Sequence, residues 1–493
     1  MFFVNANFLL MSLNNWNKNR REFFFRLSET GGALAVIFFP VSVSLSQFGL
    51  FLAILGWILW RTSPGKGVYI PTKTWELPFV FPLELKVGIF LYITILFSLL
   101  VRAGGIGASG DISGMVQAIS SGLRDEFKDI GLISMGFWVL AYTADERGRK
   151  KVYSWLKISL MILLVSGFVA IFSKYRLSKI PYHLMHGWEA VAAARYQHLA
   201  ASFFTESGSP FFLYMPIGFM GTHLTYAALL GYFTPYLFFR SVDIYLNDGI
   251  KLFVRKNIVF IVMAATALII LILNNGRSAI FGMLVALLFG LYYFIRVYWR
   301  KKIFRFLPHA VIVCAAFLLL ISVSSGAHNR LESLLSALLG QSKHTDWQRT
   351  FVWQGTLDII GRNPILGVGS GGFKPEIEQT ILHFSEENPR LWYAYSVIQR
   401  GHAHNDLFHF QSIGGIFASA AYLFLFALLA RRALLPVARR EEDYWKWSAL
   451  TIFASGLFQC YFQDDEVLLP FWIFAALLIR TTGVGKNSIS DES

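Results

Sequence analysis

A series of long apolar runs constrains the fold of this chain more than any other feature. A helix needs about 20 apolar residues to cross the hydrocarbon core of a bilayer. Only 15% of the 493 residues are charged, against roughly 25% in an ordinary soluble protein. The sequence therefore excludes a cytosolic enzyme, a secreted disulfide scaffold and a disordered chain. It predicts an all-α, polytopic membrane protein with candidate spans at 31–60, 87–101, 129–143, 155–173, 211–239, 257–273, 278–295, 307–325, 411–430, 447–462 and 467–480.

The first of these runs is too long for one span. A single helix over 31–60 would be about 45 Å long, so two short spans joined near Ser46 are expected, with one tilted helix as the alternative. Two spans here bring the total to twelve and leave both termini in the cytoplasm. Nearly twice as many of the 44 Lys and Arg residues then fall on the cytoplasmic side as on the other. Because cytoplasmic loops carry an excess of basic residues, this bias supports the count and the direction.

Basic cytoplasmic loops also explain the net charge of +14. Basic loops lie against anionic lipid, so a nucleic-acid partner is not expected. The predicted organisation is an N-terminal bundle over 1–325, a periplasmic loop over 326–410, C-terminal helices over 411–480 and a cytoplasmic tail over 481–493.

The segment 326–410 is too long for a simple connection. An amphipathic stretch at 329–335 and a helical pattern from about Asp346 to Ile360 predict helices, and Asn363-Pro364 ends the second one. Gly367, Gly369, Gly371 and Gly372 follow, predicting a flexible turn. A passive cap is the alternative to a functional loop.

The end of this loop carries the strongest candidates for chemistry. His402, His404, Asn405 and Asp406 stand directly before an apolar helix. Asn405 or Asp406 suits its N-cap, and the positive helix end would keep His404 neutral and able to accept a proton. Three interpretations remain open: a general base, a structural histidine pair, or a metal site built from His402, His404 and either His409 or Asp406.

Two arginines fall on the same predicted side. Arg277 lies in a tight connection between two apolar helices, where it could bind lipid phosphate by snorkelling or hold an anionic headgroup. Arg349 and Trp353 share one face of the predicted loop helix. That pair could bind a phosphate and a sugar ring, or form a structural cation–π contact. The acidic turn at 463–466 is expected to be solvated.

Together these motifs resemble the bacterial O-antigen ligase superfamily, which includes O-antigen polymerases and protein O-oligosaccharyltransferases. The resemblance lies in Asn275-Gly276-Arg277-Ser278, in Arg349-x-x-x-Trp353, in the stretch 363–373, and in His402-Ala403-His404-Asn405-Asp406. A further stretch, 218–227, resembles another helix-start motif of the superfamily. The motifs concentrate in 214–282 and 346–415, and the ligase branch is the most similar.

The resemblance implies a GT-C-like glycosyltransferase that needs no cofactor and no metal. Its donor would be a glycan on undecaprenyl diphosphate, and its acceptor a sugar hydroxyl of lipid A–core. His404 matches the base, and Arg277 and Arg349 match the arginines that hold the donor diphosphate. His402, Asn405, Asp406 and Trp353 would position the acceptor.

The chain departs from this pattern in one place. The superfamily has a further arginine shortly before the stretch at 218, where this chain reads Leu213-Tyr214-Met215-Pro216. Arg195 is the candidate replacement for donor binding. A polysaccharide polymerase of the same superfamily is the main alternative function, and a twelve-helix flippase or transporter is a third.

Overall fold

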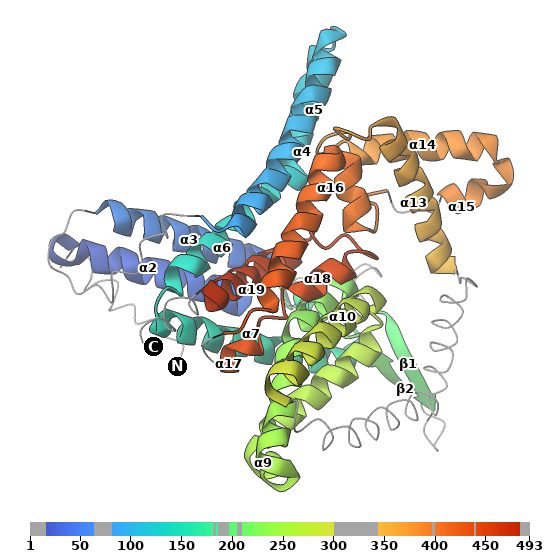
Figure 1. Ribbon diagram of the computed structural model, residues 1–493. Coiled ribbons are helices and arrows are strands. Elements are labelled where there is room, and N and C mark those ends of the chain that lie inside the picture. The colour runs from blue at the N-terminus through green and yellow to red at the C-terminus, as the bar shows by residue number, and fades with distance from the viewer. Residues whose placement is uncertain are drawn as a thin grey trace.

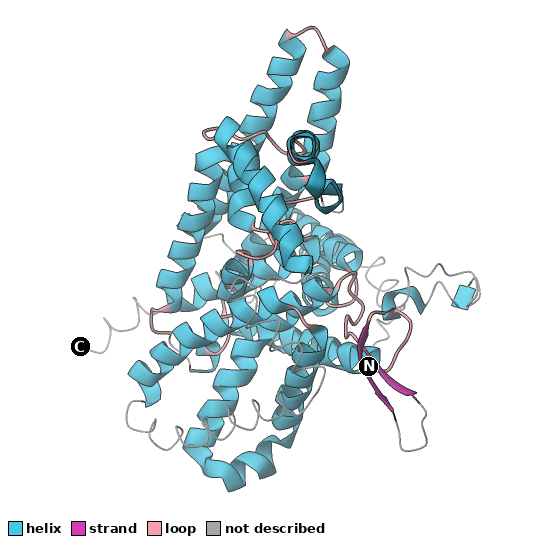
Figure 2. Ribbon diagram, turned by 90° about the vertical axis from the view of Figure 1, so that its right-hand side faces the viewer, coloured by secondary structure: helices cyan, strands magenta, loops and turns pink. Residues whose placement is uncertain are grey.

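The computed structural model covers residues 1–493 and describes all of them except 1–15, 64–80, 181–183, 186–196, 205–209, 300–343, 397–399, 438–439 and 484–493. Helices dominate the described chain (Figures 1 and 2). The α-helices are α2 (Trp16–Phe38), α3 (Val43–Thr62), α4 (Leu83–Ala108), α5 (Ile112–Arg124), α6 (Ile133–Tyr142), α7 (Glu146–Ile171), α9 (His223–Asn274), α10 (Arg277–Phe294), α13 (His344–Arg362), α14 (Phe373–Glu387), α15 (Trp392–Ser396), α16 (Asp406–Ala433), α17 (Arg440–Asp443), α18 (Leu450–Ser455) and α19 (Asp465–Gly483). Shorter elements are η1 (Glu126–Leu132), η2 (Leu177–Lys179), η4 (Ile295–Trp299) and η5 (Pro389–Leu391).

Six of the described helices are long and apolar enough to cross a membrane: α3, α4, α7, the second half of α9, α10 with η4, and α16. Large apolar side chains on their outer faces are exposed, including Phe97 on α4 and Val165 on α7. In water such surface would be unfavourable, but against lipid chains it is not. The chain is thus a helical membrane protein.

The run 31–60 is divided between two helices, but only α3 lies within it, since α2 begins at Trp16 and contributes only its last turns to the run. The break lies at 39–42, between α2 and α3, rather than near Ser46. Ser42 caps α3 by accepting a hydrogen bond from the amide of Leu45 (3.3 Å). The two helices pack closely because Gly31 and Gly49 leave no room for a Cβ between their backbones.

The predicted span at 211–239 begins too early. Residues Pro210–Tyr214 form strand β2, which pairs antiparallel with β1 (Leu199–Phe204), and the helix begins only at His223. A short apolar run rich in aromatic residues suits a strand as well as a helix, so hydropathy could not separate them. Thr222 caps α9, accepting from the amide of Thr225 (3.1 Å).

Helix α9 holds both spans predicted at 211–239 and 257–273. Its two ends meet, since the Asn274 amide group donates to the carbonyl of Pro216 (2.6 Å) and Gly276 abuts Ala227. The element therefore turns back on itself, as Figure 1 shows. Its halves are antiparallel neighbours, which is the arrangement that two consecutive spans require.

Two other predicted spans differ from the structure. Helix covers only Leu450–Ser455 within 447–462, with turns on both sides, and 129–143 is divided between η1 and α6. The span at 307–325 and the amphipathic stretch at 329–335 lie outside the described residues.

The glycine-rich stretch after α13 is a tightly packed loop, which corrects the prediction of a flexible turn. Gly367 and Gly369 have φ of 70° and 78°, and a Cβ on either would strike the backbone of α16 or of α4. The amides of Val368 and Gly369 donate to carbonyls of α16 at 2.8 and 2.9 Å. Packing against two helices thus positions α13 and α14 relative to the start of α16 (Figure 1).

Candidate functional site

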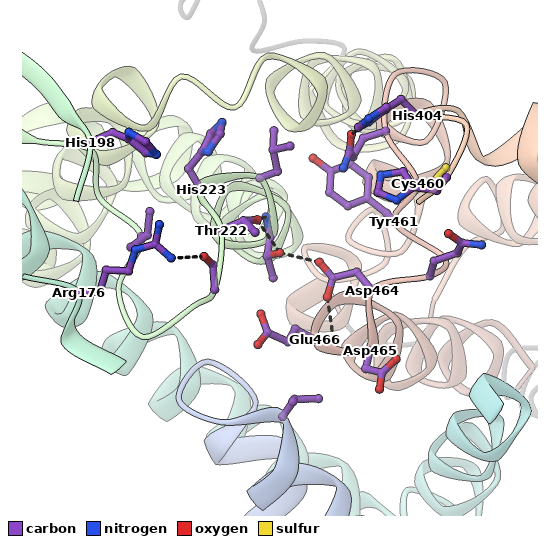
Figure 3. Close-up of a pocket in the computed structure, with 18 of the residues that line it drawn as sticks. Arg176, His198, Thr222, His223, His404, Cys460, Tyr461, Asp464, Asp465 and Glu466 are labelled. Atoms are coloured by element: carbon purple, nitrogen blue, oxygen red, sulfur yellow. Dashed lines mark hydrogen bonds between the residues drawn. The ribbon is translucent and has the colours of Figure 1, made fainter. Parts of the chain in front are cut away.

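A polar cavity of about 640 Å³ lies where helix N-termini gather. Its walls come from the start of α9, the segment before α16, the turn before α19 and the segments at 176 and 197–198 (Figure 3). The predicted topology placed the segments at 176 and 197–198, the segment before α16 and the turn at 463–466 on the periplasmic side, whereas the start of α9 fell within the span predicted at 211–239. Helix N-termini attract anions through unpaired N–H groups and the positive end of the dipole, so the cavity suits a negatively charged ligand.

His404 lies on this cavity and is held in an unusual conformation. Its φ is 52°, in the left-handed region that non-glycine residues seldom adopt. Only 8% of the residue is exposed, and Nδ1 lies 2.8 Å from Oε1 of Gln459. Burial and the positive charge of Arg349 lower the pKa of His404, although the Gln459 contact opposes the shift. His404 is therefore neutral at pH 7, as predicted, with burial rather than the helix end as the main cause.

His402 stands beside His404 on the same wall. The two rings are 4.4 Å apart in an edge arrangement. Burial and the charge of His404 lower the pKa of His402 to about 3. Its Nε2 atom is buried and has no hydrogen-bond partner among the described residues. His402 thus offers a neutral imidazole nitrogen at the cavity.

Asn405 and Asp406 hold this segment in place rather than forming the cavity wall. Asn405 is the N-cap of α16, accepting from the amide of Phe408 (3.0 Å), and its Nδ2 donates to the carbonyl of Leu457 (3.0 Å). Asp406 is only 1% exposed and accepts from the amide of Phe462 (3.2 Å). Because Asp406 is buried away from the cavity, it can position His404 but cannot contact an acceptor.

Arg349 and Trp353 extend from α13 toward the start of α16. Besides burial, the charge of Arg349 lowers the pKa of His223, His402 and His404. The ring of Trp353 packs against Phe408 at a centroid distance of 6.0 Å. Trp353 is not part of the cavity wall.

The structure places the start of α10 beside Tyr461 of the cavity wall. Ser278, next to Arg277, bonds Tyr461 through their hydroxyl groups (2.8 Å), and Tyr461 lines the cavity. Arg277 itself is half-buried and does not line the cavity. Arg195 lies outside the described residues.

The cavity also contains a cation that sequence reasoning missed. Arg176 lines it across from His404 (Figure 3), and its Nη1 donates to the carbonyl of Gly221 (3.2 Å). Its Nε is buried without a hydrogen-bond partner among the described residues. His198 and His223 lie on the same side of the cavity. No local sequence signal marked Arg176, since it lies in an irregular segment far along the chain from Gly221.

The acidic turn forms the opposite wall of the cavity and is not simply solvated. Asp464 accepts from the hydroxyl of Thr225 (2.6 Å) and from the amide of Glu466 (3.0 Å). Burial and the neighbouring Asp464 charge raise the pKa of Glu466 to about 7. These carboxyl groups join the start of α19 to the start of α9. They also give the cavity one acidic side and one side rich in arginine and imidazole.

Unlike His402 and His404, His409 contacts an acidic residue, Glu126. Its Nε2 lies 3.3 Å from Glu126 and also contacts the Gln463 amide. Burial opposes ionisation of Glu126, but hydrogen bonds from His409, Ser370 and Gly371 lower its pKa to about 2. Glu126 thereby joins the glycine-rich loop to α16. Within the described part of the chain, no three His, Cys, Asp or Glu residues are grouped to hold a metal ion.

The fold and cavity define a helical membrane protein with a cavity of polar and charged residues where helix N-termini gather. Residues 262–423 match the family model described as O-antigen ligase. This match confirms the resemblance to the O-antigen ligase superfamily, and it includes Arg277, Arg349 and His404 but not the stretch at 218–227. Curated proteins gave no significant match to the chain.

Proposed function

We propose that the protein is a glycosyltransferase that moves a glycan, an O-antigen chain, from undecaprenyl diphosphate to a sugar hydroxyl of lipid A–core. The reaction takes place at the periplasmic face of the inner membrane, in a GT-C-like bundle of about twelve spans with both termini in the cytoplasm. The superfamily match supports the lipid-linked donor. The product would be complete lipopolysaccharide.

One observation carries this proposal. A buried, neutral histidine, His404, and an arginine, Arg176, line one cavity where helix N-termini gather, and the charge of Arg349 also acts on that histidine. A glycosyl transfer from a diphosphate needs both groups, because a proton leaves the acceptor while negative charge grows on the leaving group. A flippase would instead need a path through the bundle with charged groups near mid-membrane.

In the proposed reaction, Nε2 of His404 takes the proton of the acceptor hydroxyl. The oxygen attacks the anomeric carbon as the bond from that carbon to the diphosphate breaks, so the configuration inverts. The electron pair of the broken bond remains on the diphosphate. Arg349, Arg277 and Arg176 stabilise this charge without a metal ion. Loss of one such contact costs about 3 kcal/mol, or roughly a hundredfold in rate.

His402 and Trp353 are proposed to orient the acceptor sugar. His402 lines the cavity, and its buried Nε2 atom has no hydrogen-bond partner among the described residues. The indole of Trp353 packs beside the start of α16, where a sugar ring could stack on a loop-facing aromatic group. Asn405 and Asp406 act through the backbone that carries His404.

The test is reconstitution of the full chain in proteoliposomes with an undecaprenyl-diphosphate-linked glycan as donor. His404→Ala is expected to abolish transfer while the protein still binds donor. The matched control is His383→Ala, because His383 is an exposed histidine on α14 whose side chain is 65% exposed. EDTA is expected to leave the rate unchanged. Full activity in His404→Ala would remove the general base from the proposal, and EDTA inhibition reversed by a divalent ion would establish a metal requirement.

The same assay separates ligase from polymerase. Lipid A–core is offered as acceptor in one reaction, and a second undecaprenyl-linked glycan in another. Transfer to lipid A–core alone is the expected result. Growth of the glycan on its own lipid carrier, with no product on lipid A–core, would identify a polymerase instead.

A further inference from the structure

His404 has a side-chain partner in a segment more than fifty residues further along the chain. Its Nδ1 lies 2.8 Å from Oε1 of Gln459. An amide oxygen can only accept a hydrogen bond, so Nδ1 carries the proton in this contact. The lone pair of a neutral imidazole is then on Nε2, and that tautomer is the one that can remove a proton from a substrate.

The backbone around both residues enforces this contact. The amide of Asp406 donates to the carbonyl of Gly456 (2.7 Å), and the amide of Phe462 donates back to the Asp406 carboxylate (3.2 Å). The Asn405 side chain adds a bond to the carbonyl of Leu457 (3.0 Å). Three hydrogen bonds thus join 405–406 to 456–462 on either side of the His404–Gln459 pair.

The backbone conformation of His404 also indicates that its ring is held in a fixed position. A φ of 52° at a residue that is not glycine costs free energy. Strain of this kind persists only when surrounding contacts hold it, and such residues cluster at functional sites. Here the left-handed turn places the ring against Gln459, which is itself only 9% exposed.

A neutral partner also distinguishes this pair from a histidine–carboxylate pair. A carboxylate would stabilise the imidazolium and raise the pKa of the histidine, whereas an amide orients the ring without adding charge. The charged and titratable groups around His404 belong to four sets. They are His402, Cys460 and Tyr461 beside it, Arg349 from α13 and His409 from α16, Arg176, His198 and His223 across the cavity, and Asp464, Asp465 and Glu466 of the acidic turn.

We propose that Gln459 is a positioning residue, which fixes the Nδ1–H tautomer and the ring orientation of His404 so that Nε2 faces the acceptor hydroxyl. This inference rests on the proposed function, because it assigns to Gln459 the orientation of the proposed base. Gln459 acts through His404 and does not itself contact the reacting atoms.

Gln459→Met tests the hydrogen bond, since methionine has a similar length but no acceptor oxygen. A neutral hydrogen bond contributes about 1 to 1.5 kcal/mol, so kcat is expected to fall about tenfold with the KM for donor and acceptor unchanged within about twofold. An unchanged kcat, or a change confined to KM, would refute the proposal.

Gln459→Glu tests the tautomer more directly. A carboxylate accepts the same Nδ1–H bond, so most of the activity is expected to return relative to Gln459→Met. The acidic limb of the pH–rate profile is expected to move to higher pH by about one unit, since a nearby opposite charge favours the imidazolium. Gln117→Glu on α5 is the matched control, because Gln117 is an exposed glutamine outside the site. A pH profile that coincides with that of the control would overturn the assignment.

A readout without glycan substrates separates this inference from the proposed function. Diethyl pyrocarbonate modifies neutral imidazole, and mass spectrometry of the peptide containing His404 gives its rate of modification at each pH. In Gln459→Glu the midpoint at His404 is expected to rise, whatever reaction the protein catalyses. If His404→Ala is fully active but the midpoint shifts, the proposed function fails and the contact stands. If His404→Ala is inactive and Gln459→Met has wild-type kcat, only the positioning role fails.

Discussion

The contact between the glycine-rich loop and helix α16 predicts that any side chain at Gly415 destabilises the protein. This residue has φ of 64° and ψ of −161° inside α16, where it produces a kink. That backbone region is open essentially to glycine alone, and a side chain there costs about 1 to 3 kcal/mol. In addition, a Cβ on Gly415 would lie 1.9 Å from the carbonyl oxygen of Ile365.

The unfavourable backbone conformation and the close contact with Ile365 both destabilise Gly415→Ala. A contact of 1.9 Å with a backbone atom cannot be relieved by rotating a side chain, so the loop or the helix must shift. Overpacking of this kind costs about 1 to 3 kcal/mol, and the sum is about 4 kcal/mol of unfolding free energy. For a chain of this length, each kcal/mol lowers the unfolding temperature by about 1–2 °C, by extension from the size scaling of smaller proteins. The expected decrease is about 4–8 °C.

The assay is thermal unfolding of the detergent-purified protein at one fixed scan rate, because membrane proteins commonly unfold irreversibly. The control is Gly361→Ala, near the C-terminal end of α13. A Cβ at Gly361 meets nothing within 4 Å, and alanine favours a helix over glycine by about 0.5–1 kcal/mol. Gly361→Ala is therefore expected to unfold at the wild-type temperature or slightly above. Equal unfolding temperatures for the two variants would refute the reasoning about Gly415.

Two further predictions concern the cavity. Because burial and Arg349 lower the pKa of His404 below its usual 6.5, the neutral imidazole is present at pH 7. The transfer rate should therefore be constant from pH 7 to 8 and fall only as the pH drops through the lowered pKa. A rate that already falls as the pH drops below 8 would contradict this. In steady-state kinetics, Arg176→Met should raise the KM for the diphosphate-linked donor about tenfold and leave the acceptor KM unchanged. Arg390→Met is the control, because Arg390 is exposed. Equal donor KM values in both variants would exclude Arg176 from the donor site.

Local pattern was enough to predict several elements. Hydropathy predicted two helices in 31–60 and the helix of α13, because length, periodicity and the Asn363-Pro364 stop are properties of neighbouring residues. The N-cap at Asn405 followed in the same way from residue type and position. That His404 and Arg349 act at one site, on one side of the membrane, stays a prediction; the structure shows that the charge of Arg349 acts on His404.

Other features depended on tertiary contacts. The sequence could not show that 447–462 contains only a short helix, since turns there are held by partners in the 403–406 segment. It also could not show that Arg176 shares a cavity with His404, or that Gln459 bonds the imidazole. The role expected for Arg195 remains a prediction, because that residue lies outside the described chain.

Sequence by itself determined that this chain is a helical membrane protein and that a capping residue stands directly before helix α16. Hydrophobic length and helix caps are set by residues within a few positions of one another. Only the tertiary structure decided which helix ends meet and that His404, Gln459 and Arg176 line one cavity. Those arrangements depend on packing between segments far apart in the chain, and no local periodicity records them.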